Sequence, residues 1–258
     1  MKFPWDNIYI LNLKHQKYKF NKIKKSLNKN NITKNIERFI GVYGLEDCPF
    51  GKQIQKTDSI DEKWILTENM NKKLQEKNII HKKVGDKYKY LRPGEIGHLL
   101  SFIKIMKDAL KKKYKKILIL EDDSVIEEDF KENFLKSYKN LPNNWDIVYL
   151  GIHRFHFKLT EKSNNINDYI CDLKGIFKLK DKTKHGSIYG THALLLNRKA
   201  MKAFVKAAFP LKLPSDVIMG QTITVHKLIK GYHMCKLNIN QENYDRDKST
   251  TAQLKHLS

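Results

Sequence analysis

Four apolar residues followed directly by three acids constrain this chain more than any other feature. Residues 117–120 read Ile-Leu-Ile-Leu, and Glu121, Asp122 and Asp123 come immediately after them. A short continuous apolar run is typical of a strand buried on both faces of a parallel sheet. In open α/β sheets, ligands bind beyond the carboxyl ends of such strands. The three acids therefore stand where a binding site is expected.

Apolar periodicity elsewhere predicts strands that alternate with helices. The expected strands cover residues 7–13, 36–42, 147–150, 192–196 and 232–237. The expected helices lie within residues 18–27, 60–74, 99–110, 130–141, 201–208 and 218–229. This alternation predicts one α/β domain over residues 1–258, with a mainly parallel central sheet flanked by helices. The polar stretches, 152–186 and the tail from about residue 240, are expected to be loops.

The charge of the chain is large, but its distribution argues against specific nucleic-acid binding. The formal net charge is +22, yet only five of the basic residues are arginine, and the lysines are spread along the whole chain. Arginine is the usual choice for bidentate phosphate and base-edge contacts. We therefore expect no specific nucleic-acid partner.

The cysteines and the apolar runs of the sequence indicate in which cellular compartment the protein is expected. Cys48, Cys171 and Cys235 lie far apart in sequence, which argues against a disulfide framework and fits a reducing compartment. The N-terminus shows no signal-peptide pattern, and no apolar stretch reaches the ~20 residues that a membrane span requires. These features predict a soluble, cytoplasmic protein.

The three adjacent acids admit two interpretations. Neighbouring carboxylates repel one another, so a cation or hydrogen-bond donors must offset their charge. Oxygen ligands suit Mg²⁺ or Mn²⁺ better than zinc, and such an ion could bridge a diphosphate. Alternatively, Asp122, Asp123 or Ser124 caps a helix that follows directly. A phosphorelay receiver domain is excluded, because Gly151 stands where its phosphate-accepting aspartate belongs.

Other segments accompany the acidic run in a fixed order. They are residues 8–13, 93–101, 117–123, 145–148, 189–191 with Ala200, 213–216, and Gln241 with 249–251. In this order they resemble the motifs of glycosyltransferase family 25. That family includes bacterial lipooligosaccharide sugar transferases and the collagen hydroxylysine galactosyltransferases. Phe102 stands where the family commonly has a histidine.

The resemblance implies both a fold and an activity. The fold would be a single nucleotide-diphospho-sugar transferase domain of the GT-A type. The activity would be metal-dependent transfer of a hexose, galactose or glucose, from a UDP-sugar to a glycan or hydroxylysine hydroxyl, with inversion. Mn²⁺ or Mg²⁺ would bind Asp123 and Glu121. The alternative is a non-catalytic, basic carbohydrate- or nucleic-acid-binding protein on the same fold.

Most of the remaining candidate residues follow from the same resemblance, and the histidines are chosen from their own places in the sequence. Asp216 would be the base that deprotonates the acceptor, although an aspartate in a turn before a helix is also a favoured N-cap. The candidate substrate- and donor-binding residues are Leu11, Asn12, Gly94, Gly97, Ser101, Glu121, Asp122 and His192. A purely structural role remains open for each, such as a satisfied core histidine for His192. His226 and His233 are possible further metal ligands, without a spacing motif to support them.

Overall fold

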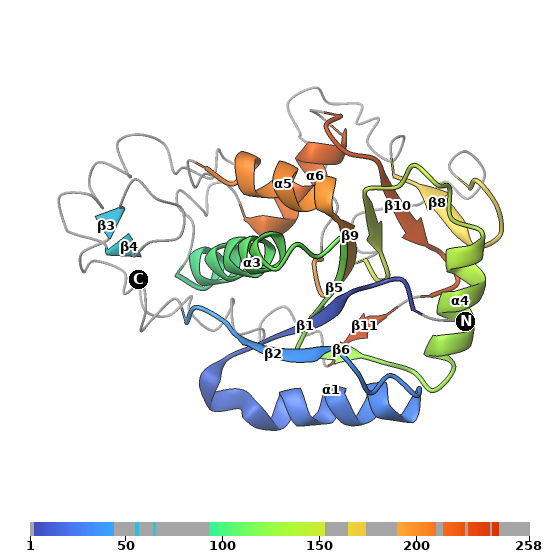
Figure 1. Ribbon diagram of the computed structural model, residues 1–258, viewed down its shortest axis with the longest axis horizontal. Helices are drawn as coiled ribbons and strands as arrows, with labels where there is room; N and C mark the ends of the chain where they lie inside the picture. The colour runs from blue at the N-terminus through green and yellow to red at the C-terminus, as the bar shows by residue number, and fades with distance from the viewer. Residues whose placement is uncertain are drawn as a thin grey trace, which may run out of the picture.

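A seven-stranded sheet forms the centre of the protein (Figure 1). The computed structural model describes residues 3–43, 55–56, 64–65, 93–152, 165–173, 190–209, 214–224, 227–237 and 239–242. The strands of the sheet are β1 (Asn7–Asn12), β2 (Ile36–Ile40), β5 (Lys116–Glu121), β7 (Ile147–Tyr149), β8 (Ile170–Asp172), β9 (Ala193–Asn197) and β10 (Gly231–Met234). Their order across the sheet is β2-β1-β5-β9-β7-β10-β8.

Most strands of this sheet run in the same direction. β1 pairs in parallel with β2 and β5, and β10 pairs in parallel with β7. β9 is antiparallel to β5 and β7, between which it lies, and β8 is antiparallel to β10 at the edge. The carboxyl ends of β1, β5, β7 and β10 therefore meet at one edge of the sheet. The prediction of an α/β fold with a mainly parallel central sheet is confirmed at this level.

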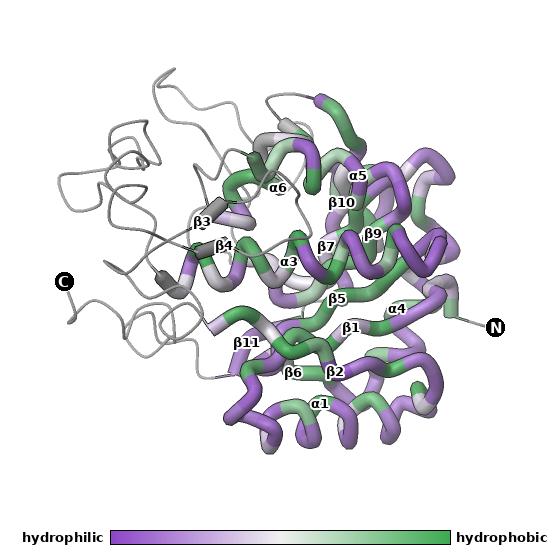
Figure 2. The backbone as a smooth tube through the Cα atoms, turned by 60° about the vertical axis from the view of Figure 1, so that its left-hand side comes forward, coloured by the Kyte–Doolittle hydropathy of each residue, from purple (hydrophilic) through white to green (hydrophobic). Residues whose placement is uncertain are grey.

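Helices cover both faces of the sheet (Figure 1). α3 (Pro93–Lys111), α5 (Arg198–Ala207) and α6 (Ser215–Thr224) lie on one face. α1 (Lys17–Lys29), which follows the short turn η1 (Lys14–Gln16), and α4 (Phe130–Lys139) lie on the other. Successive strand residues point to opposite faces, so β5 sends Ile117 and Ile119 to one core cluster, and Leu118 and Leu120 to the other. In Figure 2 the central strands are accordingly hydrophobic, whereas the helices alternate between hydrophobic and hydrophilic residues.

Short strands appear in places where no strand was predicted. β6 (Ser124–Val125) pairs with β11 (Asn240–Gln241) from the polar tail, and β8 lies in the segment expected to be a loop. β3 (Gln55–Lys56) pairs with β4 (Trp64–Ile65). The helix expected over 60–74 is therefore wrong at its two described residues, and its other residues lie outside the described part. These strands are too short to show a period of two, and none of them carries a continuous apolar run like those of β5 and β7.

Cys171 and Cys235 are joined by a disulfide, which corrects the expectation from their spacing. Their Cα atoms are 6.2 Å apart although 64 residues separate them in sequence. The antiparallel pairing of β8 with β10 brings them together, and sequence spacing alone carries no information about that pairing.

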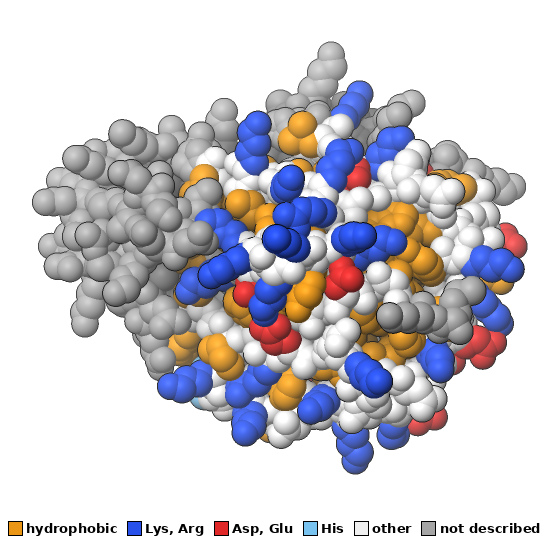
Figure 3. Space-filling view, viewed as in Figure 1, with side chains coloured by type: hydrophobic (Ala, Val, Ile, Leu, Met, Phe, Trp, Pro, Cys, Tyr) orange, Lys and Arg blue, Asp and Glu red, His pale blue; other side chains and the backbone are white. Residues whose placement is uncertain are grey.

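The face of the molecule shown in Figure 3 is rich in lysine and arginine, without segregation of charge. On the face shown in Figure 3, Lys and Arg side chains occur over the whole described area, and acidic side chains lie among them. None of the helices in the described ranges is long and apolar enough to cross a membrane.

Candidate active site

The three acids lie together at the carboxyl end of β5. Glu121 is the last residue of β5, and Asp122 and Asp123 form the turn into β6. They do not cap a helix, because the next helix, α4, begins at Phe130 and has Asp129 as its N-cap residue. The helix-cap interpretation is therefore wrong, and the charge of the acids must be offset in another way.

The negative charge of Glu121 is offset by two side chains from other elements. Its Oε1 lies 3.0 Å from Nε2 of His98 on α3, and it accepts a 2.7 Å hydrogen bond from Oγ1 of Thr191, just before β9. Burial by itself would raise the pKa of Glu121. The charge of His98 and the hydrogen bonds to His98 and Thr191 outweigh burial and lower this pKa to about 2. Glu121 is therefore ionised near neutral pH.

His98 joins three elements at this point. Its Nδ1 lies 2.7 Å from Oγ of Ser215 at the start of α6, while Nε2 contacts Glu121. Burial would lower the pKa of His98, but the neighbouring carboxylates, Glu121 first, raise it overall. The imidazole also stacks on the ring of Phe102 one turn later in α3, with centroids 4.6 Å apart. Sequence reasoning did not select His98, because a single histidine on an amphipathic helix carries no pattern.

Asp122 is held by residues from the end of β1 and from α1. Its Oδ2 accepts a 2.6 Å hydrogen bond from Nδ2 of Asn12, and Nζ of Lys19 lies 3.9 Å from Oδ1. Burial raises the pKa of Asp122 in spite of these contacts. Asn12 itself is buried, donates to the backbone oxygen of Gln16 and accepts from Nε of Arg38 at 2.6 Å. Asn12 therefore fixes the turn after β1 against the acidic run.

Asp123 has the least compensated charge of the three. Nε2 of Gln241 donates to both carboxylate oxygens, at 3.2 and 3.1 Å, and the backbone N–H of Glu242 donates to the backbone oxygen of Asp123 at 2.7 Å. Burial, followed by the charge of Glu121, raises the pKa of Asp123 to about 7. A carboxylate with this pKa gains from a nearby cation, because a cation favours its ionised form.

Asp216 lies on α6, next to Ser215. It is the second residue of the helix, and its Oδ1 accepts from the backbone N–H of Val217 at 2.8 Å. An N-cap residue stands before the helix, so this position does not match the N-cap alternative. Burial raises the pKa of Asp216 to about 6, even though the charge of His98 acts in the opposite direction. Asp216 and the acidic run therefore share one electrostatic environment through His98.

The other candidate residues mostly form hydrogen bonds or packing contacts within and between secondary-structure elements. Ser101 is buried, donates to the backbone oxygen of Gly97 at 2.6 Å and accepts from the N–H of Val42 at 2.8 Å. Leu11 is a core residue of β1, and both glycines lie inside the first turns of α3, Gly94 partly exposed and Gly97 buried. Their roles in donor binding stay predictions.

His192 holds the chain that leads to β11. Its Nε2 lies 2.7 Å from the backbone oxygen of Ile239, and its own backbone oxygen accepts from Oγ of Ser124. Burial lowers the pKa of His192, which favours the neutral ring. The contacts agree with the core-histidine alternative, and a substrate contact stays a prediction. Of the two further histidines, His233 lies in β10 near the disulfide, and His226 lies outside the described residues.

Comparison with known protein families identifies the family of this chain. The family model described as "Glycosyltransferase family 25 (LPS biosynthesis protein)" matches residues 5–219. This chain belongs to glycosyltransferase family 25. The family 25 match contains the acidic run and every candidate from Leu11 to Asp216, whereas Gln241 lies beyond it. Phe102, which also lies within the match, stacks against the imidazole of His98 from the next turn of α3.

Two curated relatives agree with membership of family 25. The chain is 33% identical over 76 residues to human (Homo sapiens) "Procollagen galactosyltransferase 2" and 32% identical over 76 residues to the mouse (Mus musculus) protein of the same name. Each match covers 28% of this chain but only 12% of the relative. Among solved structures, the chain is similar to mannose-1-phosphate geranyltransferase from Thermus thermophilus, with 11% identity, a TM-score of 0.27, and coverage of 54% of this chain and 50% of that one. That TM-score is too low to support a conclusion about the fold.

Proposed function

We propose that this protein is a metal-dependent hexosyltransferase of the GT-A type. It would transfer galactose or glucose from a UDP-sugar to a hydroxyl of a glycan or of hydroxylysine, with inversion. The observation that carries the proposal is the group of three carboxylates at the carboxyl end of β5, which caps no helix and in which the charge of Asp123 is the least compensated. Membership of family 25 supports the transferase class, and the relatives named for galactosyl transfer favour galactose.

The residues present fit a hard divalent cation such as Mn²⁺ or Mg²⁺. Asp123 offers a carboxylate whose pKa is raised by burial and by Glu121, and the side chain that bonds to it is the neutral amide of Gln241. Glu121 has one oxygen engaged by His98 and Thr191, which leaves Oε2 as the atom for a metal. Asp123 and Glu121 would hold the ion, and bound metal would neutralise charge on the diphosphate of the donor.

Asp216 would deprotonate the acceptor hydroxyl. A base works best when its pKa lies near the operating pH, and burial brings that of Asp216 to about 6. The bond between His98 and Ser215, the residue before Asp216, holds the start of α6 against Glu121. The donor-side acids and the base would thereby keep a fixed separation, which single-step inversion requires. Asn12 and the backbone near Leu11 would form the floor under the uracil.

Calorimetric titration of UDP tests the donor site directly. Titrations into the protein with Mn²⁺, and again after chelation, should show binding only with the metal. Asp123→Ala should abolish that binding while the protein stays folded. Glu128→Ala is a matched control, because it removes the same charge from a side chain that is 87% exposed and pairs with Lys29 on α1 at 3.3 Å.

The outcomes separate the proposal from its rival. Metal-dependent UDP binding that survives Glu128→Ala and is lost in Asp123→Ala supports the transferase. Folded protein that binds no UDP in either condition, but binds glycan or nucleic acid regardless of Asp123, would favour the non-catalytic alternative.

A further inference from the structure

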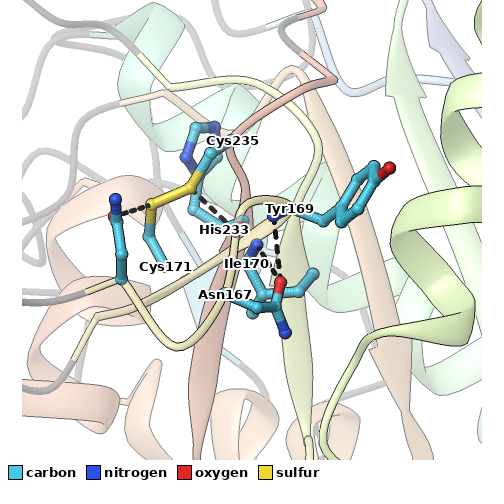
Figure 4. The surroundings of a disulfide bond; sticks show 7 residues. Asn167, Tyr169, Ile170, Cys171, His233 and Cys235 are labelled. Carbon is cyan, nitrogen blue, oxygen red and sulfur yellow. Dashed lines mark hydrogen bonds between the residues drawn. A yellow bond between two sulfur atoms is a disulfide. The ribbon is translucent and has the colours of Figure 1, made fainter.

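A second cluster of metal-binding side chains lies at the edge of the sheet, apart from the acids. Cys171, His233 and Cys235 each offer one ligand atom, and these atoms all lie within 4.8 Å of one another. Figure 4 shows the Cys171–Cys235 disulfide with His233 beside it. β10 lies three positions from β5 in the sheet order, or roughly 14–15 Å across the sheet.

The register of β8 and β10 explains why the three side chains meet. His233 is the direct cross-strand partner of Cys171, and Cys235 lies two residues after His233, where its N–H bonds to the backbone oxygen of Tyr169. Residues directly opposite, or two apart on one strand, project from the same face. Their neighbours Ile170 and Met234 pack into the core cluster on the α1 and α4 face, so the cluster projects from the other face.

The environment of the sulfur atoms suits thiols as well as a disulfide. Oδ1 of Asn165 lies 3.1 Å from Sγ of Cys171, within hydrogen-bonding range of a thiol. A disulfide sulfur has no hydrogen to donate, so only the reduced form uses this acceptor. Cys171 and His233 are buried, with exposed fractions of 4% and 1%, whereas Cys235 is partly exposed. A solvent molecule can therefore approach the cluster from the side of Cys235.

We propose that Cys171, His233 and Cys235 bind Zn²⁺ when the Cys171–Cys235 bond is reduced. Two thiolates and an imidazole are soft and borderline ligands, which select zinc over the hard ions expected at the acids. In a tetrahedral zinc site, the sulfur and nitrogen ligand atoms lie roughly 3.4–3.8 Å apart. The sulfur-to-nitrogen separations, all within 4.8 Å, therefore need to shorten by roughly 1 Å, and the two sulfur atoms must move roughly 2 Å apart once their bond is broken. Water from the side of Cys235 supplies the fourth ligand.

Reduction of the disulfide must come before metal binding. A dithiol reductant breaks the S–S bond, supplies two electrons and two protons, and itself becomes a disulfide. The two resulting thiols release two protons to solvent when zinc binds, because the thiolate is the ligand. Oxidation of the pair expels the metal, so disulfide and zinc are mutually exclusive states of one site.

Cobalt titration tests the site, because thiolate-bound Co²⁺ absorbs by charge transfer from sulfur. The full chain is reduced with a phosphine, freed of metal with a chelator and titrated with Co²⁺, then with Zn²⁺ in competition. One equivalent of Co²⁺ with a thiolate band, displaced by Zn²⁺, is expected for the reduced chain and none for the oxidised chain. Cys171→Ser and His233→Gln should each weaken binding by at least about 100-fold, beyond the 10–100-fold typical of an outer-shell loss. Cys48→Ser should keep full binding.

Two further measurements keep the test decisive. If Cys171→Ser fails to fold, Cys235→Ser replaces it at a partly exposed position, and addition of Zn²⁺ should raise the unfolding temperature of the reduced wild-type chain alone. Asp123→Ala should retain the thiolate band, which distinguishes this site from the acidic one. A reduced wild-type chain without the band, or binding that is unchanged in both Cys171→Ser and His233→Gln, overturns the proposal.

Discussion

The side-chain amide of Gln241 donates to both carboxylate oxygens of Asp123, although 118 residues separate the two in sequence. The contact arises because β11 pairs with β6 immediately after the acidic turn. It makes the C-terminal part of the described chain a component of the candidate active site.

Replacing Gln241 by glutamate should destabilise the metal-free protein. The substitution places a fourth carboxylate against Asp123, whose charge is already unfavourable in its buried position. We expect the free energy of unfolding to fall by about 1–3 kcal/mol, and Mn²⁺ to recover most of the loss. Urea unfolding with and without Mn²⁺ measures both effects. Asn240→Asp, which adds the same charge at an exposed position one residue earlier, should change stability far less.

Replacing Asp216 by asparagine should remove turnover and spare donor binding. Loss of a general base typically costs about 10²–10⁴ in rate. Metal-dependent UDP affinity should stay at the wild-type value, because the carboxylate of Asp216 bonds to Val217 within its own helix. A base must be ionised, so wild-type kcat should decrease as the pH falls through about 6 and level off above it. In Asp216→Asn, this decrease of kcat at low pH should be absent. Equal losses of UDP affinity and of turnover would argue against a role for Asp216 as the base.

Removing the imidazole of His98 should destabilise the protein through Glu121. Burial opposes the charged form of Glu121, and His98 is the main group that lowers its pKa to about 2. His98→Ala leaves Thr191 as the remaining hydrogen-bond donor to this carboxylate, and we expect a loss of about 2–3 kcal/mol in urea unfolding. The exposed His15 provides the control, since His15→Ala should lie within about 0.5 kcal/mol of wild type. Similar values for the two variants would contradict the assignment.

A methyl group at Gly151 should displace the segment that leads to β11. A Cβ there would lie 2.0 Å from the backbone oxygen of Ile239 and 2.4 Å from Nε2 of His192. Backbone cannot yield as a side chain does, so Gly151→Ala should cost at least about 1–3 kcal/mol and weaken metal-dependent UDP binding. Gly231→Ala meets only the side chain of Ile223 and should cost less, with UDP binding unchanged. Comparison of the two by thermal unfolding and UDP titration checks this.

The buried Asp146 should contribute stability that disappears in acid. Burial would raise its pKa, but bonds from Lys199 at 2.8 Å, the N–H of Lys230 at 2.9 Å and Asn197 at 3.0 Å lower it overall below 3.8. Its folded pKa lies below the unfolded value, so the contribution is full above about 3.8 and is lost as pH falls through the folded pKa. Asp146→Asn should cost about 1.5–3 kcal/mol at pH 7, and the difference should shrink below about pH 4. A difference independent of pH would show that packing dominates.

Sequence reasoning succeeded where a continuous apolar run or helical spacing of apolar residues marks an element. β1, β5 and β7 are continuous apolar runs, and α3 and α5 show helical spacing, so their existence and the position of the acids at a strand end were predicted. The sequence left open whether the acids cap a helix, because that depends on where α4 begins, and Asp122, Asp123 and Ser124 are all residue types favoured at an N-cap.

Other parts of the site were not predictable because they rest on long-range pairing. β8 and β11 are short strands in polar segments, yet they bring Cys171 to Cys235 and Gln241 to Asp123. His98 and Thr191 reach Glu121 only through the packing of α3 and the entry to β9 against β5. No local pattern marks such residues, and only a pairing of distant segments reveals them.

The dependence of Asp123 on β11 has a consequence during synthesis. Ribosomes add about 5–20 residues per second, so Gln241 follows Asp123 by roughly 6–24 s. For that interval the nascent chain carries three neighbouring carboxylates without the amide that later donates to the last of them. Divalent cations in the surrounding solution are then available partners for Asp123, so their concentration should influence how quickly the region around β5 and β6 folds during synthesis.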